Sequence, residues 1–335
     1  MTRIGFLGLG SWVPERVMTN EDWAQYVDTS DEWIRERTGI RQRHIALPEQ
    51  TTVDFAEAAS RRALEDAGLG PEDVDEILVA TDTPQAISPD TAAFLQHRLG
   101  TREVPAYDLA GSGCAGYLQA LDVARARVAL RGGRILVVAV ELISRFMDWH
   151  DRATCVLFGD AAGAAVVGRE DAGPVFRCAM GAARTGTDGA WTHILGNPTG
   201  GTARYFDEEV LREKAHRRIH MDGREVFRHA VARMSEATRQ VLADEGRSIE
   251  DLDLFVPHQA NLRILAQVAR NLGLPEDKLY VNVQDYGNTG SASVPLALDE
   301  ARRQGRIPAG SLVGCAAFGA GFHWGALLLH FEAPV

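Results

Sequence analysis

Three short segments carry side chains that could together transfer an acyl group: a nucleophilic thiol and two hydrogen-bonding groups. Cys114 stands among glycine, serine and alanine residues, His258 follows Pro257, and Asn288 lies in a glycine-containing turn. Alone, each has an ordinary structural explanation, as a small buried hydrophobe, a satisfied histidine and a turn or cap residue respectively. Their chemistry therefore depends on whether the fold brings all three together.

Cys114 has the most suggestive local setting of the four cysteines. The sequence predicts a helix that begins directly after it, and the N-terminus of a helix favours a thiolate, with a pKa of about 7 or lower. The flanking Gly113 and Gly116 let a substrate approach the sulfur and free backbone N–H groups to stabilise an oxyanion. The other cysteines, Cys155, Cys178 and Cys315, form no CxxC pair and are expected to be reduced and inert.

The elements that must position these residues come from an internal duplication. One segment pattern recurs 178 residues later, and a second recurs 177 residues later in the same order. The first pairs residues 64–75 with 242–253, and the second pairs 120–125 with 297–302. Each copy places helices before buried apolar strands, the strands being predicted at 77–80, 135–140, 254–256 and 312–317. The chain is therefore predicted to be two similar α/β halves, residues 1–170 and 171–335, with mostly parallel sheet.

The duplication also brings the three reactive residues together. Ser291 occupies the position of Cys114 in the second copy, three residues after Asn288. His258 follows a predicted strand, and ligands of open α/β sheets bind beyond the carboxyl ends of strands. All three side chains are thus expected at one edge of the sheets, which favours a functional site over three unrelated structural roles.

Bulk composition excludes some classes of function. The 335 residues are 45% hydrophobic with a net charge of −11, which disfavours nucleic-acid binding. No apolar run reaches the roughly 20 residues that span a membrane, and the N-terminus is predicted to be a strand, so a cytoplasmic protein is expected. A basic cluster is either a solvated face or a docking patch for an acidic partner; its members are Arg212, Lys214, Arg217, Arg218, Arg224, Arg228 and Arg233. Residues 189–218 are expected to form a long surface excursion.

Further segments resemble the thiolase-like condensing enzymes, most closely the β-ketoacyl-acyl-carrier-protein synthase III family. They are residues 28–34, 37–40, 148–154, 158–160, 258–263, 286–289 and 318–322. The resemblance covers essentially the whole chain. It implies a five-layered αβαβα fold, a homodimer, no cofactor or metal, and a catalytic triad of Cys114, His258 and Asn288.

The resemblance also implies a reaction. Cys114 takes the acyl group of an acyl-CoA, with the N–H groups of Cys114 and of the loop at Ala320 holding the oxyanion. Malonyl-acyl-carrier protein then loses CO₂, and His258 and Asn288 donate hydrogen bonds to the enolate. The 3-oxoacyl-acyl-carrier protein that results initiates fatty acid synthesis. Further positions match residues for CoA or the substrate (Thr29, Trp33, Arg37, Arg152, Asn261, Phe318 and Ala320) and for the carrier protein (Arg37, Arg224, Arg228 and Arg263).

One departure concerns the primer. Many relatives carry Phe where Ser88 stands, and that ring closes the acyl pocket of the partner subunit, so a deeper pocket and longer or bulkier primers than acetyl are expected. Two other enzymes remain open: a starter-unit synthase or acyltransferase of secondary metabolism on the same fold, and a Cys-His-Asn thioester hydrolase. A binding module without catalysis is disfavoured, because the triad residues are all present.

Overall fold

The structure is a computed structural model that describes residues 2–213 and 218–332. Its largest feature is a nine-stranded sheet with the order β11-β12-β13-β8-β1-β7-β6-β4-β5 within the described residues. The strands from the first half of the chain are β1 (Ile4–Trp12), β4 (Glu76–Ala80), β5 (Ala106–Leu109), β6 (Ile135–Leu142) and β7 (Asp160–Arg169). Those from the second half are β8 (Cys178–Thr187), β11 (Leu254–Pro257), β12 (Leu312–Gly319) and β13 (His323–Phe331).

The strand order is symmetric about the junction of β8 and β1. Read outward from the junction, β1-β7-β6-β4 in one half matches β8-β13-β12-β11 in the other. Strands β4, β5 and β6 pair in parallel, as do β11 and β12, whereas β7 and β13 pair antiparallel to both their neighbours. One strand in each half therefore runs against the others. This arrangement is the mixed, mostly parallel sheet predicted from the duplication.

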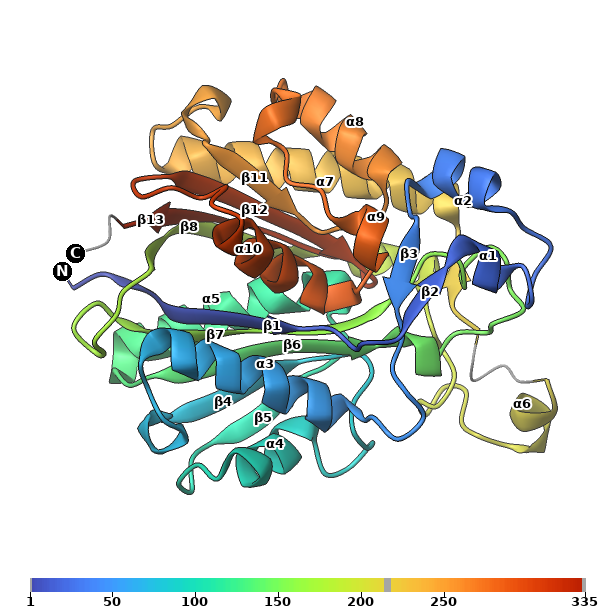
Figure 1. Ribbon diagram of the computed structural model, residues 1–335, viewed down its shortest axis with the longest axis horizontal. Helices are drawn as coiled ribbons and strands as arrows, with labels where there is room; N and C mark the ends of the chain where they lie inside the picture. Colours follow the sequence, from blue (N-terminus) through green and yellow to red (C-terminus); the bar gives the residue numbers. More distant parts are fainter. Residues whose placement is uncertain (1, 214–217, 333–335) are drawn as a thin grey trace.

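Helices form three layers around the two halves of the sheet (Figure 1). Helices α5 and α10 pack between the halves, within one core that includes strands from both. Helices α3 and α4 cover the outer face of the first half, and α7 and α8 cover that of the second. The predicted five-layered αβαβα fold is thus confirmed. The helices are α3 (Thr52–Ala67), α4 (Thr91–Leu99), α5 (Gly116–Arg131), α7 (Gly223–Asp244), α8 (Leu262–Leu272) and α10 (Ser293–Arg303).

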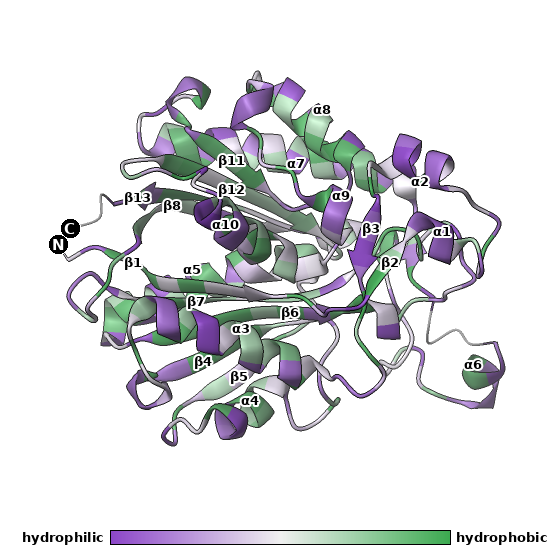
Figure 2. Ribbon diagram, in the orientation of Figure 1, coloured by the Kyte–Doolittle hydropathy of each residue, from purple (hydrophilic) through white to green (hydrophobic). Residues whose placement is uncertain are grey.

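The pattern of apolar residues explains these layers. Strands β4 and β6 are buried at every position, as expected for parallel strands that are covered on both faces. The central strands are mainly hydrophobic in Figure 2, whereas α3 and α7 alternate hydrophobic and hydrophilic residues around their axes. Each helix therefore buries one stripe against the sheet and exposes the other to solvent.

Small elements complete the edge at which the reactive residues lie. They are β2 (Val17–Thr19), β3 (Gln42–His44), α1 (Asn20–Trp23), α2 (Asp31–Thr38) and α9 (Val283–Tyr286). Helix α2 begins where the Ser30 hydroxyl accepts the N–H of Trp33, and it ends at Gly39, whose φ of 77° suits glycine. This helix presents Trp33 and Arg37, two of the predicted CoA-site residues.

The excursion predicted as irregular contains short pieces of regular structure. Strands β9 (Leu195–Gly196) and β10 (His220–Met221) pair antiparallel, and α6 (Glu208–Arg212) projects from the body of the molecule (Figure 1). The strand pair returns part of the excursion to the body, where Leu195 and Met221 line a cavity. The stretch predicted as a long surface excursion therefore contains short regular elements, and part of it reaches the cavity.

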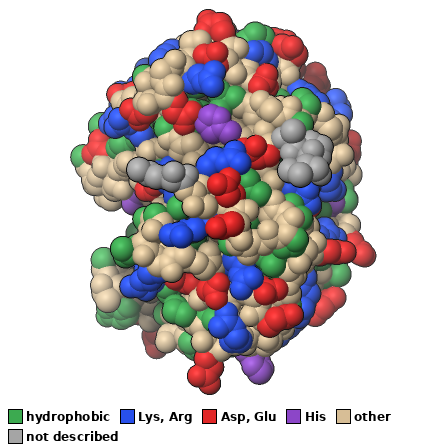
Figure 3. All heavy atoms as spheres, turned by 90° about the vertical axis from the view of Figure 1, so that its left-hand side faces the viewer, with side chains coloured by type: hydrophobic (Ala, Val, Ile, Leu, Met, Phe, Trp, Pro, Cys, Tyr) green, Lys and Arg blue, Asp and Glu red, His purple; other side chains and the backbone are tan. Residues whose placement is uncertain are grey.

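The surface that carries the two termini mixes positive and negative side chains (Figure 3). Ion pairs of Arg3 with Glu170 and Glu332 lie at this end of the molecule. Such exposed pairs contribute little individually, about 0–1 kcal/mol each. Among the described residues, the helices include none with the length and apolar character needed to cross a membrane.

Candidate active site

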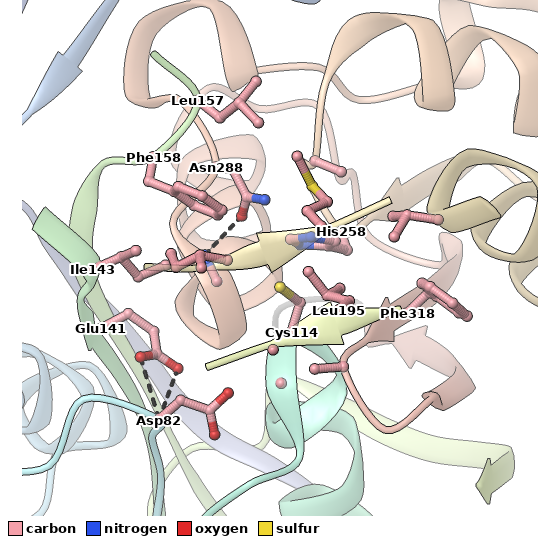
Figure 4. Close-up of a pocket in the computed structure, with 18 of the residues that line it drawn as sticks. Asp82, Cys114, Glu141, Ile143, Leu157, Phe158, Leu195, His258, Asn288 and Phe318 are labelled. Atoms are coloured by element: carbon pink, nitrogen blue, oxygen red, sulfur yellow. Dashed lines mark hydrogen bonds between the residues drawn. The ribbon is translucent and has the colours of Figure 1, made fainter. Parts of the chain in front are cut away.

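A single cavity brings the three predicted catalytic residues together. Cys114, His258 and Asn288 all line it, and Figure 4 shows their side chains facing a common space. The wall around them is largely apolar and includes Ile143, Phe146, Leu157, Phe158, Leu195, Met221, Val226, Met234, Ile264 and Phe318. An apolar cavity with a few convergent polar groups is typical of a small-molecule site.

Cys114 lies in a short 3-10 turn, Gly113–Ala115, that leads directly into α5. Gly113 has a φ of 55°, and a side-chain Cβ at this position would stand 2.5 Å from the backbone nitrogen of Ala320. A Cβ at Gly319 would in turn meet the backbone nitrogen of Cys114. Glycine is therefore required on both sides, and the backbones of the two halves of the chain meet at the nucleophile.

The electrostatics of Cys114 contradict one prediction from the sequence. Burial raises the pKa of the thiol well above its ordinary value, and the carboxyl groups of Glu141 and Asp82 raise it further. The helix N-terminus was expected to lower this pKa to about 7 or below. That expectation is wrong, because desolvation and two nearby carboxyl groups outweigh the helix terminus.

His258 stands at the carboxyl end of β11 and is only 2% exposed. Its backbone N–H donates to the carbonyl of Ala316 at 2.7 Å, and its ring Nδ1 lies 2.6 Å from Ser293 Oγ. Burial lowers the pKa of the imidazole to about 3, so the ring is neutral at physiological pH. Ser293 was not singled out from the sequence, since a serine near the start of α10 reads as an ordinary helix residue.

The contact between Ser293 Oγ and His258 Nδ1 is compatible with the tautomer that carries its proton on Nε2. The N–H of Gln259 donates to Ser293 Oγ at 3.4 Å, which leaves the hydroxyl proton free to point at Nδ1. Nδ1 then accepts, and Nε2 carries the proton. His258 can therefore donate a hydrogen bond to a group in the cavity while it remains uncharged.

Asn288 is held on both sides of its backbone. Its N–H donates to the carbonyl of Leu157 at 2.8 Å, and its carbonyl accepts the N–H of Gly159 at 3.0 Å. The side-chain Oδ1 accepts the N–H of Gly290 at 2.9 Å (Figure 4). Because Oδ1 is occupied in this way, the Nδ2 amide group is the part of Asn288 that is left to donate into the cavity.

A buried cation supports the segment that holds Asn288. Arg43 is 0% exposed, and its guanidinium donates to the carbonyl of Val156 and, at 2.6 Å, to Asn20 Oδ1. Asn20 in turn donates to Asp31 Oδ1 at 2.8 Å at the start of α2. Burial lowers the pKa of Arg43 to about 9, so this position costs solvation energy. This burial could not be predicted from the sequence, because an arginine in a short strand is usually exposed.

Two carboxyl groups lie below Cys114, as Figure 4 shows. Glu141, at the end of β6, accepts from Ser291 Oγ at 2.7 Å, from Thr83 Oγ1 at 2.9 Å and from the N–H of Asp82 at 3.2 Å. Burial and the charge of Asp82 raise the pKa of Glu141 to about 8. Neither carboxyl was predicted as a site residue. A polar residue at the end of a predicted strand was the available signal.

Trp33 at the mouth is already stacked. The guanidinium carbons of Arg37 and Arg152 each lie 4.8 Å from its ring centroid, and Arg152 also donates to the carbonyl of Asp28 at 2.8 Å. The predicted sandwich of an adenine between Trp33 and Arg152 therefore requires Arg152 to move off the indole. Thr29 lies one turn away, with its buried hydroxyl unbonded among the described residues.

Asn261 caps α8 by accepting the N–H of Ile264 at 3.0 Å, and it lines the cavity mouth. Three of the predicted docking cations, Arg37, Arg224 and Arg263, surround a hollow that adjoins this mouth. Arg228 bonds to Glu225 instead. Phe318 and Ala320 line the inner wall, whereas Ser88 is exposed and lies outside the cavity of its own chain.

The basic cluster does not form one face. Arg212 lies on α6, whereas Arg224, Arg228 and Arg233 lie on α7. Arg233 faces Asp188 and stacks on Trp324, with its guanidinium carbon 4.5 Å from the ring centroid. Lys214 and Arg217 lie outside the described residues.

Comparisons with known proteins identify the family of this chain. The family 3-oxoacyl-[acyl-carrier-protein] synthase III matches residues 107–189, and its C-terminal region matches residues 242–331. The β-ketoacyl-[acyl-carrier-protein] synthase III of Oleidesulfovibrio alaskensis is 45% identical over 98% of this chain and 99% of its own length. That of Symbiobacterium thermophilum is 46% identical over 98% of both chains.

Solved structures give the same result. The crystal structure of β-ketoacyl-[acyl-carrier-protein] synthase III from Thermus thermophilus superposes with a TM-score of 0.88 at 43% identity, covering 98% of this chain and all of the other. Both halves of the chain, including the three residues that line the cavity, fall within these matches. The chain belongs to the 3-oxoacyl-[acyl-carrier-protein] synthase III family.

Proposed function

We propose that this protein condenses an acyl-CoA primer with malonyl-acyl-carrier protein, releases CO₂ and forms a 3-oxoacyl-acyl-carrier protein that initiates fatty acid synthesis. The observation that carries the proposal is the convergence of Cys114, His258 and Asn288 on one apolar cavity within a chain of this family. The reaction needs no cofactor, because loss of CO₂ supplies the carbanion.

The first half-reaction moves the acyl group to Cys114. The sulfur attacks the thioester carbonyl, the carbon–sulfur bond to CoA breaks, and the thiol proton leaves on CoA. The N–H groups of Cys114 and Ala320 are proposed to hold the oxyanion. Their support is the close approach of the two backbones at Gly113 and Gly319.

The second half-reaction forms the carbon–carbon bond. The malonyl thioester loses CO₂, and the enolate oxygen accepts hydrogen bonds from His258 Nε2 and Asn288 Nδ2. The carbanion attacks the acyl carbonyl on Cys114, and the released thiolate takes a proton from solvent. Two observations support these roles: Asn288 Oδ1 is occupied by Gly290, and His258 is neutral. A neutral donor stabilises the enolate without protonating its carbon.

The entry of both substrates is proposed at the mouth beside Trp33 and Asn261. Trp33 and Arg152 would hold the adenine of CoA by stacking once Arg152 leaves the indole. Arg37, Arg224 and Arg263 around the adjoining hollow suit the acidic carrier protein, with Arg228 beside them. A homodimer in the cytoplasm, with Ser88 facing the pocket of the partner, completes the proposal.

Product analysis tests this function. Purified protein is incubated with an acyl-CoA panel, with and without malonyl-acyl-carrier protein, and the products are identified by mass spectrometry. The expected products are a 3-oxoacyl-carrier protein and CO₂ in equal amounts. Release of free acid without a condensed product would favour a hydrolase and contradict the proposal.

A further inference from the structure

Asp82 is one of two carboxyl residues in a cavity whose wall is largely apolar. It follows β4 by two residues, and its side chain is exposed although Thr81 and Thr83 on either side are buried. It lines the same cavity as Cys114, close to Ile143 and Glu141 (Figure 4). This part of the cavity lies below the sulfur in Figure 4, so an acyl group on Cys114 can extend toward it.

The hydrogen bonds of the two carboxyl groups differ. Glu141 accepts from three donors, which are the hydroxyls of Ser291 and Thr83 and the N–H of Asp82. The carboxyl of Asp82 accepts the N–H of Gly111 at 2.9 Å, and the N–H of Gly113 also donates to it. A carboxylate can accept about four hydrogen bonds, so Asp82, which lines the cavity, retains free capacity.

An alkyl chain pressed against this carboxylate would exclude water from it and replace no hydrogen bond, which is costly. A hydroxyl or ammonium group on the acyl chain would donate to the free oxygen and remove that cost. The remaining wall, from Ile143, Phe146 and Leu195, suits the apolar part of such a chain. The site therefore combines an apolar wall with the Asp82 carboxyl, which can accept further hydrogen bonds.

We propose that Asp82 is a specificity-determining residue that selects acyl-CoA primers with a hydrogen-bond donor, a hydroxyl or an amino group, on a short acyl chain. This inference rests on the proposed function and names the substrate class of the same site. It makes Asp82 the group that separates donor-bearing primers from the alkyl primers that fill the same volume.

Matched primer pairs test the proposal. Initial rates of Cys114 acylation are measured by intact-protein mass spectrometry with 3-hydroxybutyryl-CoA against butyryl-CoA, and with 4-aminobutyryl-CoA against pentanoyl-CoA. The native protein is expected to favour the donor-bearing member of at least one pair by about 10-fold or more. Asp82→Ala should abolish this preference by slowing the donor-bearing primer and speeding the alkyl primer.

Asp82→Asn is the matched control, because the amide oxygen keeps the bond to Gly111 and removes the charge. If the selected donor is an ammonium, Asp82→Asn should lose the preference, and if it is a hydroxyl, most of the preference should remain. An equal rate for both members of both pairs in the native protein would overturn the inference, as would a preference that survives in Asp82→Ala. If Asp82→Ala does not fold, two measurements test the inference instead. They are the rates of Asp82→Asn with 4-aminobutyryl-CoA and pentanoyl-CoA, and the rate ratios of the native protein for both primer pairs. Absence of acylation by every primer in the native protein would instead refute the proposed function.

Discussion

The turn that carries Cys114 and the turn that follows Asn288 share a backbone but not a chemistry. Gly113–Ala115 and Gly290–Ala292 are both 3-10 turns that run directly into a central helix, and Gly113 and Gly290 have φ values of 55° and 57°. Cys114 lines the cavity, whereas Ser291, its counterpart, is 1% exposed and donates to Glu141. The duplication therefore gives both halves the same backbone turn. The surrounding side chains make Cys114 a nucleophile in one copy and Ser291 a structural residue in the other.

The two turns also meet different neighbours. The turn of Cys114 packs on the backbone of Gly319 and Ala320, which leaves N–H groups near the sulfur. The turn of Ser291 packs on the Glu141 side chain, which accepts its hydroxyl. A nucleophile therefore needs a side chain that points into the cavity without a bonded partner. A position at the start of a helix does not by itself provide this.

Moving the cysteine from position 114 to position 291 is expected to have the largest effect on activity. Cys114→Ala is expected to lose acylation and condensation by more than about 10³-fold, because Cys114 is the one cysteine that lines the cavity in the described part of the chain. Adding Ser291→Cys to this variant should restore nothing, since position 291 does not face the cavity. Intact-protein mass after incubation with acyl-CoA measures this, and an acylated Cys at 291 would contradict the account.

Asn288, which belongs to the second turn, has a different role from Cys114. Asn288→Ala should lower the rate of CO₂ release from malonyl-acyl-carrier protein by about 10²–10³-fold, the usual cost of losing one oxyanion donor. Acylation of Cys114 by acyl-CoA should change less than about 10-fold. The two rates are measured separately, by radiolabelled CO₂ release and by mass spectrometry. Equal losses in both rates would contradict separate roles.

Alanine in place of each glycine tests the different packing of the two turns. A Cβ at Gly113 would meet a backbone nitrogen at 2.5 Å, whereas one at Gly290 would meet Glu141 Cγ, a side-chain atom, at 2.8 Å. Gly113→Ala should therefore lower the free energy of unfolding by about 3 kcal/mol, and Gly290→Ala by about 2 kcal/mol, since both also have positive φ. Urea unfolding measures both values.

Gly132→Ala provides the control for those variants. Gly132 has a φ of 72° with open space around it, so only the backbone conformation is strained and about 1 kcal/mol is expected. A loss at Gly113 no larger than at Gly132 would show that the two halves do not pack tightly at the nucleophile.

Glu141→Gln is expected to have the smallest effect, which is a change in the pKa of the Cys114 thiol. Burial is the main cause of the raised pKa of the Cys114 thiol, and the charge of Glu141 is the second. Removing a nearby negative charge favours the thiolate, so the pH profile of iodoacetamide alkylation at Cys114 should shift to lower pH. Glu170→Gln is the control, because Glu170 lies at the surface and does not line the cavity, and it should leave the alkylation profile of Cys114 unchanged. A shift of this profile to higher pH in Glu141→Gln would contradict the sign.

Much of the fold could be predicted because its signals are local. The buried strands β4, β6, β11 and β12 are continuous apolar runs, and the duplicated segments fixed the order of helices around them. The predicted placement of Cys114, His258 and Asn288 on one edge agrees with the cavity that all three line. Their catalytic roles, and the boundary at residue 170, remain predictions.

What could not be predicted depends on contacts between residues distant in the chain. The hydrogen bonds of Arg43 with the carbonyl of Val156 and of Ser293 with His258 join residues that are distant in sequence. The pKa of Cys114 was misjudged for the same reason, since Glu141 and Asp82 approach it only in three dimensions. The stack of Arg152 on Trp33 likewise depends on tertiary packing.

A single-turnover experiment tests the central account most directly. Native protein and Asn288→Ala are loaded with an acyl-CoA, freed of CoA, mixed with malonyl-acyl-carrier protein and digested, and the peptide that contains Cys114 is weighed over time. The acyl mass should appear on Cys114 in both proteins, disappear within one turnover in the native protein, and persist in Asn288→Ala. Acyl mass on another residue, or equal discharge from both proteins, would contradict the account.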